Sequence, residues 1–295
     1  MKYPPISIAY ALAWKCYCNC PICLSGVQGK EYMITDINKW KKNIAPVIAY
    51  NGSVRLSLTG GEPMLFWDKT DELLEFIKYL HKNEIHVCLN TTGANMTAEK
   101  LKTLDKYLDT ILLSVRGFSV ENVSDEFGID EKYAEELRNT QLMILHEIHK
   151  TNIKLEIATV VTKKNSTEID DIGAELCKIN KNVIWRIEEY YRNGKQVNQT
   201  NEKFDLEAIK YKDLVKNLTE KYSNDIFIRE SSKENRLNAP DPFLFPDGDL
   251  HSTSDNAYRL LGHIEQYDFT TIKTRRNWDS YQKSMRNWGW ERDNY

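Results

Sequence analysis

Short apolar stretches alternate with longer amphipathic stretches up to about residue 190, and this rhythm constrains the fold more than any other feature. The apolar stretches predict strands at residues 6–14, 54–58, 85–89, 110–115, 153–161 and 183–187. The amphipathic stretches between them predict helices at residues 36–50, 71–82, 97–108, 131–150 and 166–179. Strands that alternate with helices form βαβ units, whose strands lie parallel. The sequence therefore predicts an α/β fold with a partial (βα)6 TIM-like barrel.

The charge of the chain excludes several kinds of partner. The 295 residues include 40 Lys and Arg against 43 Asp and Glu, a net charge of −3, so we expect no nucleic acid and no membrane as partners. No apolar run approaches the ~20 residues that span a bilayer. The segment 6–14 follows Pro4 and Pro5 and lacks a small-residue cleavage site, so we interpret it as a buried strand and not as a signal peptide. These features predict a cytoplasmic protein.

Four of the six cysteines lie close together directly after the first predicted strand: Cys16, Cys18, Cys20 and Cys23. Clustered thiols without a secretory signal indicate metal or redox chemistry. Cys16, Cys20 and Cys23 have the spacing C-x-x-x-C-x-x-C, and three thiolates can hold three irons of a cubane cluster while the fourth iron stays open. A zinc knuckle and inert thiols are the alternatives, although a zinc site usually pairs two distant C-x-x-C turns.

The second motif is Gly60-Gly61-Glu62-Pro63, which follows the strand at 54–58. Glycines at this place let a ligand approach the backbone closely. A fixed carboxylate beside them suits an ammonium group. Alone the motif indicates no more than a turn, but it lies one βα unit after the cysteine loop.

The two motifs and the βα rhythm together resemble the radical S-adenosylmethionine (radical SAM) superfamily, over about residues 6–190. The resemblance implies that Cys16, Cys20 and Cys23 ligate a [4Fe–4S] cluster. It also implies that the open iron binds the amino and carboxylate groups of S-adenosylmethionine. Cys18 departs from the family's usual pattern, and we expect it to be a spectator because the other three cysteines already satisfy the spacing.

The resemblance also implies which residues bind S-adenosylmethionine. They are Gly60, Gly61 and Glu62 for its amino group, Ile22 for its adenine, and Ser114 and Arg116 for its ribose and carboxylate. Weaker candidates at other strand ends are Asn90, Thr159, Thr162 and Asn165. Each polar residue in these sets is also explained as an ordinary strand terminus. Many relatives carry an aromatic residue where this chain has Ile22.

Two domains are expected, a radical SAM core at residues 1–191 and an α+β extension at 192–295 that closes the barrel and contributes to substrate binding. Because no cysteine follows Cys177, we expect one cluster only, and we expect neither an N-terminal leader-binding domain nor a B12 domain. The extension is predicted to hold a helix at 206–222, a strand at 225–229, a hairpin at 241–251 and a basic, aromatic-rich tail at 273–295.

The resemblance implies an enzyme that cleaves S-adenosylmethionine reductively to a 5′-deoxyadenosyl radical, which removes hydrogen from a substrate. A peptide is the first hypothesis for the substrate, and flavodoxin or ferredoxin is an expected electron donor. The second hypothesis is a viperin-like enzyme that acts on a nucleotide or other small molecule, with Arg116, Arg186 and Arg192 near phosphates. The third is a non-catalytic metal-binding module.

Overall fold

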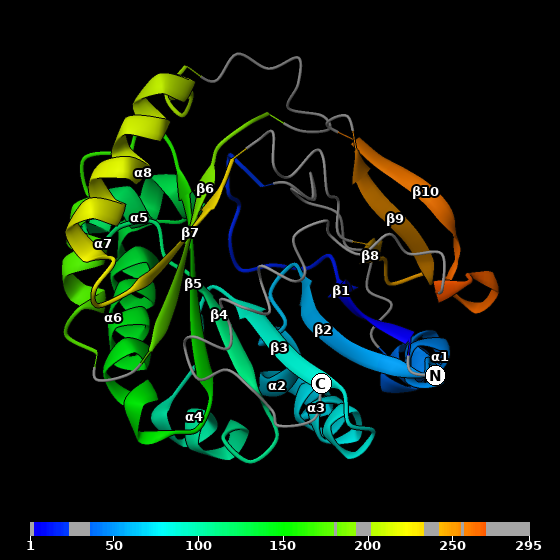
Figure 1. Ribbon diagram of the computed structural model, residues 1–295. Coiled ribbons are helices and arrows are strands. Elements are labelled where there is room, and N and C mark those ends of the chain that lie inside the picture. Colours follow the sequence, from blue (N-terminus) through cyan, green and yellow to red (C-terminus); the bar gives the residue numbers. More distant parts are fainter. Residues whose placement is uncertain are drawn as a thin grey trace.

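One continuous sheet forms the centre of the molecule. The computed structural model describes residues 3–23, 36–179, 182–192, 202–232, 242–254 and 257–269. In these ranges ten strands form one sheet in the order β10-β9-β8-β1-β2-β3-β4-β5-β6-β7. Neighbours from β1 to β7 are parallel and follow the order of the chain, as successive βαβ units require. The predicted α/β fold is confirmed, and the sheet curves as an open, partial barrel (Figure 1).

The strands occupy most of the predicted positions. Their bounds are β1 Tyr3–Ala13, β2 Gly52–Gly60, β3 His86–Thr91, β4 Thr110–Ser114, β5 Lys154–Val161, β6 Val183–Glu189, β7 Phe227–Ser231, β8 Pro242–Leu244, β9 Asp249–Ser254 and β10 Ala257–His263. The helices are α1 Ile37–Ile48, α2 Leu65–Thr70, α3 Glu72–Lys82, α4 Ala98–Leu104, α5 Val120–Phe127, α6 Glu131–Glu147, α7 Ile169–Leu176 and α8 Ala208–Tyr222. Among the described residues, no helix is long and apolar enough to cross a membrane.

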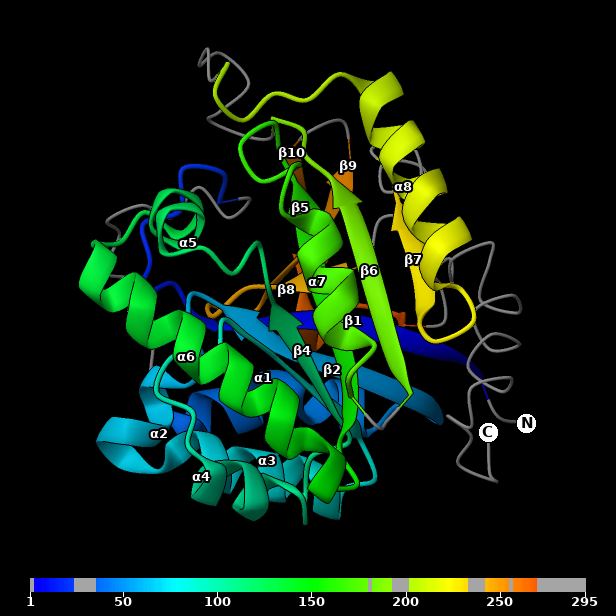
Figure 2. The ribbon, with the colours of Figure 1, turned by 90° about the vertical axis from the view of Figure 1, so that its left-hand side faces the viewer.

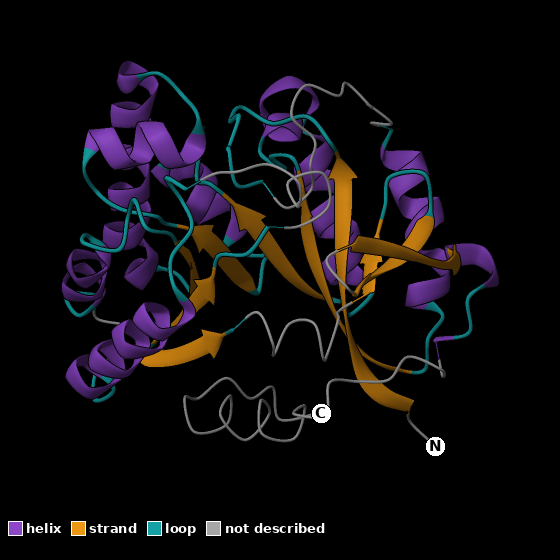
Figure 3. Cartoon of the chain, turned by 90° about the horizontal axis from the view of Figure 1, so that it is seen from above, coloured by secondary structure: helices purple, strands orange, loops and turns teal. Residues whose placement is uncertain are grey.

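Helices cover the outer face of the sheet, and the alternation of residues in each strand explains why. In β1, Ile8 and Leu12 are fully buried against the helices, as is Tyr10 between them. Burial of an Ile or Leu side chain contributes about 1.5–3 kcal/mol. Trp40 of α1 anchors its helix by donating from Nε1 to the Leu12 carbonyl oxygen at 3.2 Å. Figure 2 and Figure 3 show the helical layer on one side of the strands.

The start of α4 follows the sequence signal, whereas α7 starts later than predicted. The Thr97 hydroxyl accepts a hydrogen bond from the Lys100 amide at 3.2 Å, which caps α4. The prediction that a helix starts at residue 166 is wrong, because residues 163–168 form turns and α7 begins at Ile169. The carboxylate of Glu168 is instead used at the start of α5, where it accepts from the Ser119 amide at 3.1 Å.

Three elements were not predicted. Helices α2 and α5 have six and eight residues, too few for a clear helical period, and β10 carries two exposed leucines, Leu260 and Leu261. The predicted hairpin at 241–251 is confirmed as β8 and β9, whose turn contains Gly248 at φ +103°. Strand β8 runs parallel to β1 and extends the sheet on the side opposite to β7. The tail at 273–295 lies outside the described residues.

Candidate active site

The loop that carries the cysteines leaves the carboxyl end of β1, and the end of β2 holds its base. The amide of Gly61 donates to the Ala13 carbonyl oxygen at 2.8 Å, and the amide of Glu62 donates to the Lys15 carbonyl oxygen at 2.8 Å. A Cβ atom at Gly61 would lie 1.8 Å from the Lys15 carbonyl oxygen, which no side chain tolerates. Gly60 has φ +120°, and a Cβ atom there would lie 2.2 Å from the Ala13 carbonyl oxygen. The two glycines therefore make the close approach between β2 and the cysteine loop possible.

The end of α5 holds the other side of the same loop. The Asn19 amide donates to the Phe127 carbonyl oxygen at 2.9 Å. Gly128 ends the helix at φ +61°, and a Cβ atom there would lie 2.1 Å from the Asn19 carbonyl oxygen. Sequence reasoning missed this anchor because it did not predict α5. The signal was present, since Phe127-Gly128 is the pattern of a helix that ends on glycine.

The four thiols lie in different surroundings. Cys16 is exposed, whereas Cys18 and Cys20 pack against an apolar cluster of α5 and α6 that includes Phe127 and Leu137. The Cys18 amide donates to Cys16 Sγ at 3.4 Å. The pKa of the Cys18 thiol is raised by its side-chain hydrogen bonds with Cys16 and Cys20 and then by burial. The hydrogen bond from Cys18, followed by the nearby Arg116 cation, lowers the pKa of Cys20 to about 6 despite burial.

Arg116 brings a positive charge to the cysteine loop from the end of β4. Its guanidinium carbon lies 4.6 Å from the centre of the Phe127 ring, and Nη1 donates to the Glu126 carbonyl oxygen at 2.7 Å. The buried Glu126 carboxylate lies 4.0 Å away. Burial acts to lower the pKa of Arg116, but Cys20 and Glu126 outweigh this effect and raise it. Arg116 is thus a fixed cation beside the thiols.

Glu62 is fully buried, and its carboxylate accepts four hydrogen bonds. Oε1 accepts from the Thr91 hydroxyl at 2.6 Å and from the Met64 amide at 3.1 Å. Oε2 accepts from the Thr92 amide at 2.8 Å and from the Thr92 hydroxyl at 2.7 Å. Burial raises the pKa of Glu62 although these donors lower it. A carboxylate has about four lone-pair positions, so this one is fully used within the protein.

The structure brings most of the predicted cofactor residues to one end of the sheet. Asn90 and Ser114 end neighbouring strands, and Asn90 Nδ2 donates to the Thr59 hydroxyl at 3.3 Å. Sequence reasoning missed Gln141 of α6, whose Nε2 donates to the carbonyl oxygens of Thr92 and Ser114, both at 2.9 Å. Gln141 therefore fixes the ends of β3 and β4 relative to each other.

Two predicted residues lie in different surroundings from the others. Ile22 is buried in a small apolar cluster with Tyr190 and Phe204. Thr159 is fully buried on the helix-covered face of β5, where its hydroxyl accepts from Trp185 Nε1 at 2.9 Å. The structure does not bring Thr159 together with the residues that face the inside of the barrel.

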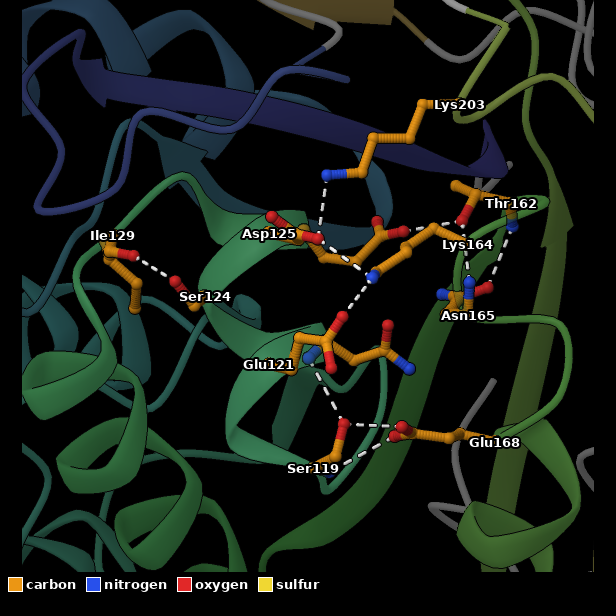
Figure 4. A network of polar contacts seen from close by, with 12 residues as sticks. Ser119, Glu121, Ser124, Asp125, Ile129, Thr162, Lys164, Asn165, Glu168 and Lys203 are labelled. Atoms are coloured by element: carbon orange, nitrogen blue, oxygen red, sulfur yellow. Dashed lines mark hydrogen bonds and ion pairs between the residues drawn. The ribbon is translucent and has the colours of Figure 1, made fainter.

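The weaker candidates Thr162 and Asn165 belong to a polar network between α5 and the loop after β5 (Figure 4). The Thr162 hydroxyl donates to Glu126 Oε1 at 2.5 Å, and Asn165 Oδ1 accepts from the Thr162 amide at 2.9 Å. Lys164 Nζ lies between Glu121 at 2.6 Å and Asp125 at 3.0 Å. The network ties α5, and through it the cysteine loop, to β5.

The inner face of the sheet is more accessible than its outer face. On β1, the inward Ser7 and Ala9 are partly exposed while their neighbours Ile6, Ile8 and Tyr10 are buried. The inward residues Ser57 and Thr59 of β2, Ala158 and Val160 of β5, and Arg186 of β6 are also partly exposed. The interior beside the cysteine loop is therefore lined by small and polar side chains that solvent reaches.

The residues present fit an iron–sulfur cluster. Three cysteines lie on one loop whose backbone is fixed on both sides, and Arg116 balances negative charge beside them. In the described ranges, no three His, Cys, Asp or Glu side chains converge on a single metal ion. A cubane does not require such convergence, because each thiolate binds its own iron.

Comparison with known families decides the assignment. The family model described as the radical SAM superfamily matches residues 15–173, which is more than half of the 295 residues. This chain belongs to the radical SAM superfamily. It is therefore a radical SAM enzyme, and its cofactors are a [4Fe–4S] cluster and S-adenosylmethionine. A comparison with curated proteins finds no match.

Solved structures of radical SAM enzymes share the fold. SuiB from Streptococcus suis bound to S-adenosylmethionine has a TM-score of 0.69 at 13% identity, covering 91% of this chain and 65% of SuiB. The structure of anSMEcpe with bound AdoMet and Kp18Cys peptide has a TM-score of 0.66 at 19% identity, covering 93% of this chain and 82% of anSMEcpe. This chain thus spans just under two thirds of the length of SuiB.

Proposed function

We propose that this radical SAM enzyme modifies a peptide. The observation that carries the proposal is the accessible inner face of the sheet, which runs from β1 and β2 to β5 and β6 beside the cysteine loop. An extended peptide fits a long, partly polar surface of this kind better than a compact molecule does. SuiB bound to its precursor peptide SuiA, with a TM-score of 0.65 at 14% identity, and the peptide complex of anSMEcpe support the proposal through their shared fold.

The proposal assigns the cluster to Cys16, Cys20 and Cys23, with Cys18 as a spectator. The cluster and S-adenosylmethionine, when bound, supply a 5′-deoxyadenosyl radical that removes hydrogen from the substrate. The protein's own residues fix the cysteine loop, place Arg116 beside it and exclude water from the buried Glu62. The end of the sheet that carries Gly60, Gly61, Asn90 and Ser114 is the proposed surface for S-adenosylmethionine, with Ile22 beside the adenine.

The cysteine assignment can be tested by substitution. Anaerobic purification is expected to give a brown protein with about four irons per chain. Cys16→Ala, Cys20→Ala and Cys23→Ala are each expected to lose the cluster and the release of 5′-deoxyadenosine, as measured by iron content and chromatography. Cys18→Ala is the matched control and is expected to keep both. Loss of the cluster in Cys18→Ala with retention in Cys16→Ala would contradict the assignment.

The peptide proposal requires its own experiment. Co-expression with a short peptide encoded beside the gene, followed by mass spectrometry, is expected to show a mass change that Cys20→Ala abolishes. The electron donor is proposed to be an external flavodoxin or ferredoxin in the cytoplasm. Flavodoxin with its reductase is therefore expected to replace dithionite in the release of 5′-deoxyadenosine. An unmodified peptide, together with full turnover on a nucleotide, would instead support the viperin-like alternative.

The surroundings of three arginines argue against the viperin-like alternative, which requires them near phosphates. Arg116 lies against Glu126 and the cysteines, and Arg192 is paired with Asp205. Arg186 donates to Glu188 Oε1 at 2.7 Å, so all three arginines expected near phosphates have carboxylate partners. Arg186 lies on the inner face of the sheet, with a side chain 21% exposed.

A further inference from the structure

A cluster of charged side chains crosses the inside of the barrel, away from the cysteine loop. Arg55 Nη2 on β2 donates to Glu156 Oε1 on β5 at 2.6 Å. Strands β3 and β4 lie between β2 and β5 in the sheet, so the two side chains meet only because the sheet curves around them. The neighbours of Glu156, Leu155 and Ile157, pack in the outer core, which leaves Glu156 on the inner face.

Two further arginines extend this barrel cluster along β6 and β7. Arg186 Nη2 donates to Glu188 Oε1 at 2.7 Å, and its Nη1 lies 4.0 Å from Glu156 Oε2. Arg229 of β7 is in register with Arg186, so both side chains lie on the same face of the parallel sheet. The barrel cluster is defined here as Arg55, Arg186, Arg229, Glu156 and Glu188.

Three guanidinium groups and two carboxylates lie together in the barrel cluster. Burial acts to raise the pKa of Glu156, yet Arg55, Arg186 and Arg229 together lower it. The arginines therefore act jointly at one place inside the barrel, in surroundings where charge interactions are stronger than in water.

The barrel cluster is also accessible. The side chains of Arg55 and Arg186 are 12% and 21% exposed, and Arg229 is partly exposed as well. Small side chains lie beside it, because Ser7 is in register with Arg55 and Ala158 with Arg186. Guanidinium groups that solvent reaches past small neighbours attract anionic groups, and their planar set of donors matches a carboxylate in particular.

We propose that the barrel cluster binds a carboxylate side chain of the substrate, so that the enzyme selects a peptide with Asp or Glu near the modified residue. The inference rests on the proposed function. The position of the barrel cluster follows from the strand register, in which Arg186 pairs with Ala158 and Ala158 pairs with Ser114. The barrel cluster therefore reaches the level of the proposed S-adenosylmethionine surface. Selection by charge inside the barrel differs from selection by a separate peptide-binding domain, because it acts next to the reacting bond.

Binding of defined peptide pools to the cluster-loaded enzyme with S-adenosylmethionine tests the proposal under anaerobic conditions. One pool of acetylated, amidated dodecapeptides contains Asp and Glu at randomised positions, and a matched pool contains Asn and Gln instead. Retained peptides are separated by rapid gel filtration and counted by mass spectrometry. The wild type is expected to retain the acidic pool at least about tenfold better than the amide pool, as loss of a charge-assisted bond implies.

Single substitutions show which side chains produce the preference for the acidic pool. Arg229→Gln is expected to remove most of that preference, whereas Arg259→Gln on the exposed surface of β10 is the matched control and is expected to keep it. Glu188→Gln removes a competing carboxylate from Arg186 and is expected to strengthen retention of the acidic pool by a few fold. Because the two barrel variants change binding in opposite directions, a general loss of folding cannot imitate the pair of results.

The outcomes distinguish the proposal that the barrel cluster binds a carboxylate from the proposal that the enzyme modifies a peptide. Equal retention of both pools by the wild type, or an unchanged preference in Arg229→Gln, overturns the inference and leaves peptide modification standing. Retention of neither pool by an enzyme that still releases 5′-deoxyadenosine overturns the proposed function. Retention of ATP, in place of the peptides and dependent on Arg229, identifies a nucleotide substrate and overturns both.

Discussion

Two glutamates of the same sheet, Glu62 after β2 and Glu156 within β5, are each only 1% exposed, but they are stabilised in opposite ways. Glu62 accepts four hydrogen bonds from uncharged donors, and burial still raises its pKa. Glu156 lies among three arginines, which lower its pKa against the same effect of burial. At Glu62 the hydrogen bonds do not fully offset the lost hydration, whereas at Glu156 the nearby positive charges do.

The two glutamates therefore have different structural roles. Glu62 joins the ends of β2 and β3 by binding the Thr91 hydroxyl and the backbone and hydroxyl of Thr92. Glu156 joins β2 to β5 across the interior and keeps arginines close together. One carboxylate shapes the end of the sheet, and the other holds charge inside it.

The largest expected effect comes from removing the charge of Glu156. Glu156→Gln leaves Arg55 and Arg186 without their shared carboxylate, and breaking a buried ion pair costs about 3–5 kcal/mol. The free energy of unfolding, measured by urea titration, is expected to fall by that amount. A double variant, Arg55→Met with Glu156→Met, is the control and is expected to lose much less. A loss below about 1 kcal/mol in Glu156→Gln would mean that the arginines do not depend on this carboxylate.

A smaller effect is expected at Glu62. Glu62→Gln keeps one acceptor oxygen but turns an amide toward the Thr92 donors, and an unsatisfied buried donor costs about 1–3 kcal/mol. The cluster absorption is expected to persist, while the affinity for S-adenosylmethionine falls about ten- to a hundredfold, because Glu62 positions the ends of β2 and β3 that carry the proposed cofactor surface. Calorimetric titration measures this affinity. Unchanged binding would mean that Glu62 does not position the surface that binds S-adenosylmethionine.

The smallest effect, of order 1 kcal/mol, is a difference in pH dependence between the two variants. The folded pKa of Glu156 is lowered, so its contribution to stability is present above the unfolded pKa and is lost as the pH falls through the folded value. The folded pKa of Glu62 is raised, so stability decreases as the pH rises from the unfolded value of about 4.3 toward the folded value.

Urea titrations between pH 3 and 8 distinguish the two behaviours. The destabilisation by Glu156→Gln is expected to shrink toward the acid end of this range, and that by Glu62→Gln is expected to grow there. Parallel pH profiles for the two variants would show that the surroundings of the two carboxylates do not differ as described.

The sequence allowed the elements with local patterns to be predicted. The βα rhythm, the cysteine spacing and Gly60-Gly61 lie within short segments, and the structure uses the glycines where the chain passes β1 most closely. The orientation of Thr159 was also available, because it alternates in phase with the buried Leu155 and Ile157. The side of a strand, and not only its end, decides which residues reach the interior.

The contacts that depend on the curvature of the sheet could not be predicted. Arg55 and Glu156 are 101 residues apart, and nothing in their local sequences indicates that β2 and β5 face each other. Gly128 and Gln141 are similar cases, because each acts on a loop or strand end from a distant helix. Hydrophobic alternation gives the outer face of the barrel, but the polar inner face requires the three-dimensional register.

The double anchoring of the cysteine loop has a consequence for how the enzyme matures. The anchors are backbone hydrogen bonds from Gly61, Glu62 and Asn19, and none of them involves a sulfur or iron atom. The most distant partner is the Phe127 carbonyl oxygen, so the loop takes its shape only after nearly the first half of the chain has folded. We therefore expect iron and sulfide to enter a loop whose backbone is already held in place by the protein.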